Sequence, residues 1–307
     1  MHSHHKYYVV TEDLHTVMAQ WAEESGFVIP DENYFDHNHL HLRQHLETAL
    51  NIPTNTVLVE SLPYEMISEK LNINTLNFVD RHGNLFGYDK VVSLDHIYGT
   101  ALPCRHEMLE ISRVVNEEGE DIGYTPRGNY KSIEEQVAIL SQGIESVLLV
   151  DDGLWTGKTV EHIINLFNSN KIEVVGVVVG VRINKGELPF LYKAVETYDR
   201  FRPVLDWVCE RDFFFGAPYG GRSVAGYTRI GMYYPSNSVT LSNWASVNDD
   251  GAFRQFCLQA SIDLFRRIEK LSSKPVLLGD LARVPYEMMM RSESEEFVPL
   301  LQAVLEY

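Results

Sequence analysis

The sequence contains few cysteines. Its 307 residues include three, Cys104, Cys209 and Cys257, which lie far apart in the chain. An odd number of widely spaced cysteines argues against a disulfide framework and against a CxxC zinc site. Such cysteine usage favours a reducing compartment, so we expect a cytoplasmic protein.

The sequence also lacks long apolar runs and an excess of positive charge. No run approaches the roughly 20 apolar residues that a membrane-spanning helix needs, and residues 1–8 contain no apolar core of a secretion signal. Lysine and arginine number 26 against 43 aspartates and glutamates, which gives a formal net charge of −17. This balance argues against binding to nucleic acids or anionic membranes, so we expect small-molecule partners.

One stretch combines the features of a binding site. Four apolar residues, Val147–Val150, run directly into Asp151 and Asp152, and a glycine-containing turn and an amphipathic segment, Val160–Phe167, follow. This pattern predicts a buried parallel strand, a tight loop at its carboxyl end and the first turns of a helix. Amide groups at such a helix start suit a phosphate, and two adjacent carboxylates suit hydroxyl groups or a divalent cation. A ribose 5-phosphate with Mg²⁺ meets all of these requirements.

The stretch resembles the 5-phosphoribosyl-1-diphosphate (PRPP) loop of the type I phosphoribosyltransferases. That family has an apolar strand, two acidic residues, two or three variable residues and then Thr-Gly-x-Thr. This chain has Asp151-Asp152, Gly153-Leu154-Trp155 and Thr156-Gly157-Lys158-Thr159 in that order. Weaker likeness extends over residues 88–215.

The resemblance implies roles for these residues. Asp151 and Asp152 would be the catalytic pair that holds the ribose hydroxyls and Mg²⁺, the latter partly through water. The amides of Thr156–Thr159 would bind the 5-phosphate. The PRPP-binding residues predicted in this way are Asp151, Asp152, Gly153, Leu154, Trp155, Thr156, Gly157, Lys158 and Thr159.

Two further segments correspond to parts of the family's active site. The family's pyrophosphate loop falls at residues 95–100, which gives Tyr98, Gly99 and Thr100 as contacts, although the usual Gly-Gly or basic character is missing. The family's mobile lid falls in the turn-rich segment 115–131, where Arg127 and Lys131 are the cations. A solvated surface hairpin is the alternative for that segment.

The acceptor is less well defined. In the resembled family a late strand and loop place an aromatic ring on the nucleobase, and Trp207 and Phe213 are candidates for that contact, with packing in the core as the alternative. Trp155 occupies a position that is an aspartate in hypoxanthine–guanine members. Because an indole cannot act as a general base, the acceptor either needs no base there or is not a salvaged purine.

Two other motifs carry less weight. Gly157-Lys158-Thr159 matches the end of a Walker A loop, but that loop requires glycine at position 152, where this chain has aspartate. His41 and His45 have the spacing of a helical metal pair, but no acidic or cysteine partner stands at ligand spacing. We therefore reject the Walker A interpretation and interpret the histidines as the polar start of a helix.

The fold class that we expect is α/β. A central parallel sheet flanked by helices, of the type I phosphoribosyltransferase kind, would have N-terminal helical and C-terminal α+β additions. The expected division is an accessory region at 1–75, a core at 76–215 and an extension at 216–307 that forms a hood or an oligomer surface. The expected helices lie at 11–24, 40–50, 102–114, 132–141, 251–271 and after Ser294, with a hairpin at 76–88 and strands near 56–62, 90–95, 146–150, 172–181, 203–215 and 227–234.

The leading functional hypothesis is a Mg²⁺-dependent enzyme of nucleotide metabolism. It would transfer the phosphoribosyl group from PRPP to a nitrogen acceptor and release pyrophosphate, and it would form a homodimer. A second hypothesis keeps the fold as a PRPP- or nucleotide-binding regulatory protein without transferase activity. A third is a hydrolase that cleaves an N-glycosidic or diphosphate bond.

Overall fold

The computed structural model describes residues 6–50, 57–86, 88–183, 190–197, 204–234, 247 and 251–306. The chain forms two compact units, each built from separate segments. Unit 1 comprises residues 1–62, 113–123 and 205–307, and unit 2 comprises residues 63–112 and 124–204. The division at residues 75 and 215 that we expected from the sequence stays a prediction. Within the described ranges, no helix is long and apolar enough to cross a membrane.

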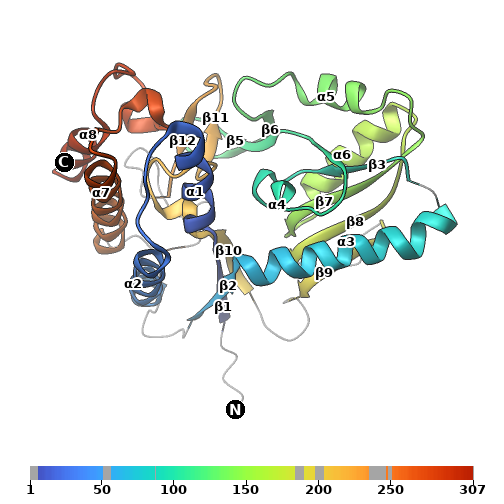
Figure 1. The fold of residues 1–307 in the computed structure, drawn as a ribbon, viewed down its shortest axis with the longest axis horizontal. Helices are drawn as coiled ribbons and strands as arrows, with labels where there is room; N and C mark the ends of the chain where they lie inside the picture. Colours follow the sequence, from blue (N-terminus) through green and yellow to red (C-terminus); the bar gives the residue numbers. More distant parts are fainter. Residues whose placement is uncertain are drawn as a thin grey trace, which may run out of the picture. The chain divides into compact units, whose positions relative to one another are not determined.

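Unit 2 contains a five-stranded parallel sheet flanked by helices, which confirms the α/β class (Figure 1). The strand order is β4-β3-β7-β8-β9, so β7, which carries the acid pair, is the central strand. The strands are β3 (Lys90–Ser93), β4 (His106–Met108), β7 (Ser146–Leu154), β8 (Glu173–Arg182) and β9 (Tyr192–Thr197). The helices are α3 (Tyr64–Phe86), α4 (His96–Thr100), α5 (Ile133–Leu140) and α6 (Lys158–Ser169).

Both faces of this sheet are covered, which explains why β7 and β8 are almost continuously apolar. On one face, alternate residues of the strands pack with α5 and α6 in a single core. That core includes Val147, Leu149, Val177, Val179, Ile133, Val137, Leu140, Val160, Ile163 and Phe167. Helix α3 lies along the opposite face (Figure 1).

Two glycines of β8 allow α3 to approach the sheet closely. A methyl group built at Gly176 would lie 2.3 Å from Cζ of Phe78, and one built at Gly180 would lie 2.8 Å from Cγ2 of Ile67. Since side chains four residues apart on a strand share a face, both glycines face the same helix. The Gly180 position would also lie 2.6 Å from the carbonyl oxygen of Asp152, so the backbone of the acid pair is packed against it.

Replacing Gly176 by alanine should lower the free energy of unfolding by about 1–3 kcal/mol, the usual range for an overpacked core. The added methyl group forces the Phe78 ring, and with it α3, away from the sheet. Urea unfolding of the variant measures the loss. The same substitution should cost much less in a Phe78→Leu background, and an equal loss in both backgrounds would contradict this packing.

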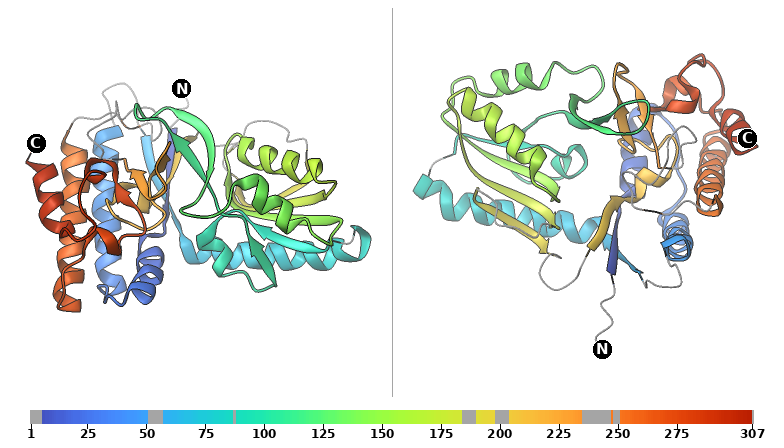
Figure 2. Two further views of the ribbon diagram at one scale, coloured as in Figure 1. Left: turned by 90° about the horizontal axis from the view of Figure 1, so that it is seen from above. Right: turned by 180° about the vertical axis from the view of Figure 1, so that it is seen from behind.

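Unit 1 combines helices with two sheets. Helix α7 packs against both α2 and α8 (Figure 2). One sheet has the order β10-β1-β2, and the other has the order β13-β12-β11-β5-β6 and includes both parallel and antiparallel pairs. The helices are α1 (Leu14–Ser25), α2 (Glu32–Leu50), η1 (Glu210–Phe213), α7 (Ala252–Ser272), η3 (Leu278–Asp280), η4 (Tyr286–Met288) and α8 (Phe297–Leu305). The strands are β1 (Lys6–Glu12), β2 (Val57–Pro63), β5 (Ile111–Val115), β6 (Asp121–Pro126), β10 (Val204–Cys209), β11 (Arg222–Val224), β12 (Ile230–Met232) and β13 (Val284–Pro285); β2, β5, β6 and β10 extend across a unit boundary.

Several local expectations are confirmed. The helix expected at 132–141 is α5, and it begins with a capping box, with Glu135 N–H donating to Ser132 Oγ at 3.2 Å and Ser132 N–H donating to Glu135 Oε2 at 3.1 Å. The strand–helix–strand unit β7-α6-β8 joins parallel neighbours, as expected. The expected helices near 11–24 and 251–271 and after Ser294 correspond to α1, α7 and α8. The helix expected at 40–50 is the second half of α2, which begins earlier, at Glu32.

Two expected elements are wrong. The hairpin at 76–88 does not form, because residues 64–86 make one continuous helix, α3, whose Ile67, Leu71 and Phe78 recur at helical spacing and are buried. The helix at 102–114 does not form either. That segment contains β4, which pairs with β3, and the start of β5, which pairs with β11. Pairing with distant strands outweighed the local apolar pattern in this segment.

Candidate functional site

The acid pair of β7 lies within the strand rather than after it. We expected the strand to end at Val150, but β7 continues to Leu154, with Asp151 in register with Val179 and Gly153 in register with Val181. The turn therefore begins at Trp155, and Gly153 belongs to the ladder. Alternation along the strand leaves Asp151 8% exposed and Asp152 half-buried.

The surroundings of Asp151 disfavour its negative charge. Burial, followed by the charges of Asp152 and Asp95, raises the pKa of the Asp151 carboxyl well above its usual range. Asp95 follows the neighbouring strand β3, whose end is fixed beside β7 by a 2.8 Å hydrogen bond from the Leu94 amide to the Val150 carbonyl. A bound cation, or hydroxyl groups that donate hydrogen bonds, would stabilise the charged form of this carboxyl.

The turn after β7 leads into the start of α6. Gly157, the residue before the helix, adopts a left-handed conformation with φ of 74° and makes no capping bond. The Thr156 Oγ1 atom accepts a hydrogen bond from the amide of Lys158, the first helical residue, at 3.4 Å. Thr156 and Lys158 are exposed, and Trp155 and Thr159 are partly buried. The first amides of a helix carry positive partial charge and can accept an anion. The predicted phosphate-binding residues therefore form a helix N-terminus directly after the acid pair.

Arg182 is the described cation at the end of β8. It is in register with Leu154, and its guanidinium carbon lies 4.4 Å from the ring centroid of Tyr192. Arg182 is the last residue of β8, at the carboxyl end of the sheet, where parallel sheets bind ligands.

Residues 95–100 form a short helix, α4, where a pyrophosphate loop was expected. The Tyr98 amide donates to Asp95 Oδ1 at 2.7 Å, and the Gly99 amide donates to the Asp95 carbonyl at 3.0 Å. Thr100 Oγ1 donates to the Ile97 carbonyl at 2.9 Å. In this conformation these groups hold the helix together, so they do not form an amide cradle. A methyl group at Gly99 would lie 2.7 Å from Met108 and from Ser93 Oγ, which gives this glycine a packing role.

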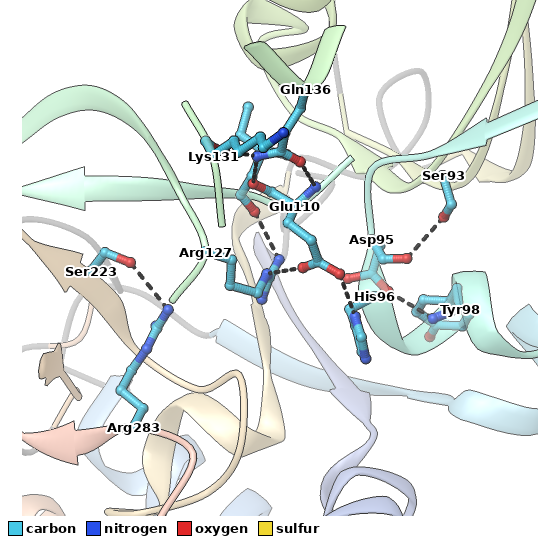
Figure 3. Close-up of polar contacts among 11 residues, drawn as sticks. Ser93, Asp95, His96, Tyr98, Glu110, Arg127, Lys131, Gln136, Ser223 and Arg283 are labelled. Atoms are coloured by element: carbon cyan, nitrogen blue, oxygen red, sulfur yellow. Dashed lines mark hydrogen bonds and ion pairs between the residues drawn. The ribbon is translucent and has the colours of Figure 1, made fainter. Parts of the chain in front are cut away.

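The two cations of the expected lid, Arg127 and Lys131, contact other residues of unit 2. Arg127 Nη2 donates to the Ile111 carbonyl at 2.9 Å, and Arg127 Nε lies 3.4 Å from Glu110 Oε2 (Figure 3). The Lys131 carbonyl accepts a 2.8 Å hydrogen bond from Gln136 Nε2. These contacts hold the Arg127 side chain and the Lys131 backbone in place.

The two predicted acceptor-stacking rings belong to unit 1. Trp207 Nε1 donates to Thr11 Oγ1 at 2.8 Å. Phe213 is 0% exposed and meets Tyr234 and Phe253 edge to face. In this conformation Phe213 is a core residue, which was the alternative to stacking.

The histidines of α2 do not gather metal ligands. The His37 and His41 rings lie 4.2 Å apart, whereas His45 stacks on Phe256 at 4.1 Å. Within the described part of the chain, no group of three or more histidine, cysteine, aspartate or glutamate side chains could hold a metal ion. His41 and His45 lie inside α2, which begins at Glu32, so the interpretation of these histidines as the start of a helix is wrong.

A second polar cluster, in unit 1, has the outline of a catalytic triad. Ser61 Oγ lies 2.7 Å from His39 Nε2, and His39 Nδ1 lies 3.3 Å from Glu210 Oε1. Glu12 Oε1 also lies 3.1 Å from His39 Nε2. Burial alone would lower the pKa of His39, but hydrogen bonds and charges from Glu12 and Glu210 outweigh burial and raise it to about 9. Because the imidazole is protonated at neutral pH, it cannot take the Ser61 proton.

The sequence placed Asp95 and His96 in the expected pyrophosphate loop but gave neither of them a role, and it gave none to Glu110. Asp95 had a usable signal, because it follows an apolar run as Asp151 does, and parallel strands end at the same edge of a sheet. The pairing of His96 with Glu110 had none, since the two stand fourteen positions apart with no periodic relation.

The described site therefore joins three features at one edge of the sheet. They are the carboxylates of Asp151 and Asp152 on β7, the start of α6 after Gly157, and a third acid, Asp95, which follows β3. No family model matches the chain, and no curated protein is significantly similar to it.

Proposed function

We propose that the chain binds PRPP with Mg²⁺ through residues 151–159 and transfers its phosphoribosyl group to a nitrogen acceptor, with release of pyrophosphate. The finer fold assignment, a type I phosphoribosyltransferase-like core in unit 2, is part of this proposal. The observation that carries it is the acid pair on the central strand, with Asp151 buried, followed after a short turn by the start of α6. A sugar phosphate bound with Mg²⁺ needs carboxylates and a phosphate site close together in this way.

The side chains present fit Mg²⁺. Asp151 and Asp152 offer only oxygen donors, which Mg²⁺ prefers. The negative charges of Asp152 and Asp95 disfavour the charged form of the buried Asp151 carboxyl, and a bound cation would compensate for them. When bound, the ion would offset negative charge on the diphosphate. Asp152, which is half-buried, is the better placed of the two for the ribose hydroxyls. The Thr156–Thr159 turn would hold the 5-phosphate and fix the position of C1.

A regulatory binding protein is the second candidate, and α4 favours it. The amides of Tyr98 and Gly99 are engaged inside this helix rather than presented to a diphosphate. A protein of this kind would bind PRPP without cleaving it. Binding at residues 151–159 is common to both candidates.

Incubation with PRPP, Mg²⁺ and a panel of nucleobases separates these functions. Pyrophosphate release that requires one base supports transfer, and PRPP binding without release supports the regulatory protein. Formation of ribose 5-phosphate without an acceptor indicates a hydrolase. If PRPP does not bind, residues 151–159 are not a PRPP site.

Removal of Mg²⁺ should weaken PRPP binding by about tenfold or more, since two carboxylates would then face the diphosphate without compensation. Titration calorimetry with and without a chelator measures this effect. Inorganic phosphate serves as the control ligand, because it needs only the loop amides. An equal dependence of both ligands on Mg²⁺ would contradict the assignment of the ion to the acid pair.

A further inference from the structure

His96 and Glu110 form a close pair in unit 2 that the roles above do not use. His96 Nδ1 lies 2.9 Å from Glu110 Oε1 (Figure 3). The Glu110 side chain is 4% exposed, whereas that of His96 is 22% exposed. The imidazole therefore has one nitrogen held by a buried carboxylate, while part of the ring reaches the surface.

The position of Glu110 is fixed from several sides. Its amide donates to Gln136 Oε1 at 2.9 Å, and its carbonyl accepts from Gln136 Nε2 at 3.2 Å. The Arg127 amide also donates to this carbonyl, and Arg127 Nε lies 3.4 Å from the second carboxylate oxygen. A carboxylate held this firmly fixes the ring that it contacts, which is how a carboxylate orients a working histidine.

The pair stands at the edge of the sheet that carries the candidate site. His96 directly follows Asp95, whose charge contributes to the raised pKa of Asp151. Leu94, two residues before His96, is hydrogen-bonded to Val150 of the central strand. His96 is therefore the histidine nearest in the chain to the end of β3, beside the strand that holds the acid pair.

The substrate chemistry calls for a cation or a proton donor in this region. PRPP carries its charge on the 5-phosphate and on the 1-diphosphate, whereas the chain has a net charge of −17. When the bond between C1 and oxygen breaks, the electron pair stays on the diphosphate oxygen. A hydrogen bond or a proton from an imidazolium stabilises that oxygen.

We propose that His96, positioned by Glu110, contacts the diphosphate of PRPP and donates a proton to the oxygen that leaves C1. This inference rests on the proposed function. In the step, the bond from C1 to oxygen breaks, the oxygen keeps the electron pair and takes the proton from His96 Nε2, and the acceptor nitrogen bonds to C1 and releases its own proton to solvent. His96 then regains a proton from solvent. Glu110 and Arg127 position the imidazole and do not react.

The test compares two ligands that differ only in the diphosphate. His96→Gln should bind PRPP about tenfold more weakly than the wild-type protein, because a charge-assisted contact is lost, and should bind ribose 5-phosphate with unchanged affinity. His106→Gln is the matched control, since His106 lies on β4 in register with Val91, near the amino end of β3. That variant should bind both ligands as the wild-type protein does.

The outcomes separate this inference from the function on which it rests. If the wild-type protein does not bind PRPP, the proposed function fails. If it binds PRPP but His96→Gln keeps full PRPP affinity, or loses affinity for both ligands equally, the role of His96 is overturned. In the active enzyme, His96→Gln should also lower the rate of pyrophosphate release at saturating PRPP, and an unchanged rate would overturn the proton transfer.

Discussion

Replacing Asp151 and Asp152 together by asparagine should weaken PRPP binding by about 100-fold or more and should also stabilise the folded protein at neutral pH. The loss of affinity follows because each carboxylate makes charge-assisted contacts to hydroxyls or Mg²⁺, each worth about 1.5–3 kcal/mol. Calorimetric titration with PRPP and Mg²⁺ measures the first effect, and thermal unfolding measures the second.

The gain in stability follows from the raised pKa of Asp151. Since burial and the charges of Asp152 and Asp95 raise this pKa in the folded state, the folded protein binds a proton that the unfolded chain has lost. Stability therefore declines as pH rises from the ordinary aspartate value toward the raised value. Asparagine cannot ionise, so the advantage of the variant should grow over the same pH range. An acid pair that lowers folding stability but is needed for binding should show this pH dependence.

Asp89 provides the matched control at the opposite end of the same sheet. Its carboxylate accepts hydrogen bonds from the amides of Glu145 and Ser146 at 2.7 Å and 3.0 Å, and these bonds lower its pKa. A lowered pKa means that the charged form stabilises the fold above the ordinary aspartate value. Asp89→Asn should therefore lose stability at neutral pH and keep PRPP affinity. If Asp89→Asn and the Asp151→Asn, Asp152→Asn double variant change stability and PRPP affinity in the same way, the acid pair has no special role.

The second large effect concerns His39 and the stability of unit 1 at alkaline pH. The pKa of His39 is raised from an ordinary 6.5 to about 9, so the folded protein holds a proton that the unfolded chain releases near pH 6.5. The resulting stabilisation is fully present below pH 6.5 and is lost as pH rises through about 9. A shift of this size corresponds to about 3 kcal/mol. The groups that face the ring are Glu12 of β1, Glu210 of η1 and Ser61 of β2, and Arg43 of α2 acts on Glu12.

Hydrogen exchange in α2 measures this effect locally, which matters because a chain with two units need not unfold in one step. His39→Asn should exchange much faster than the wild-type protein near pH 6 to 7, after correction for intrinsic rates, because it leaves Glu12 and Glu210 without their cation. The two proteins should converge above the raised pKa. His41→Gln, an exposed change on the same helix, should behave as the wild-type protein does. If the difference in exchange rate between His39→Asn and the wild-type protein does not depend on pH, the protonated form of His39 does not stabilise this unit.

The sequence was most informative where local pattern and burial agree. The run Val147–Val150 predicted the central strand, and Ser132 with Glu135 predicted a helix start, because the chemistry of each lies within a few residues. The continuation of β7 through Asp151 to Leu154 could not be predicted in the same way. It depends on the ladder with β8, whose register lies outside the local pattern.

Elements that depend on distant partners were harder to predict. The glycine at position 83 and the polar residues around it suggested a turn, yet the helix α3 is continuous there and packs on Gly176 and Gly180 of β8. The contact between His96 and Glu110 likewise requires Gln136 and Arg127 to hold Glu110 in place. Four residues from separate parts of the chain have to meet before this pair exists, so no spacing rule could reveal it.

The central claim is that the acid pair and the start of α6 form one site for PRPP. The most direct measurement is calorimetric titration of PRPP, with Mg²⁺, into the wild-type protein and the Asp151→Asn, Asp152→Asn double variant. We expect PRPP to bind to the wild-type protein, ribose 5-phosphate to compete with it, and the double variant to lose PRPP binding while it is still folded. Equal PRPP affinity in the two proteins, or no binding to the wild-type protein, would contradict this claim.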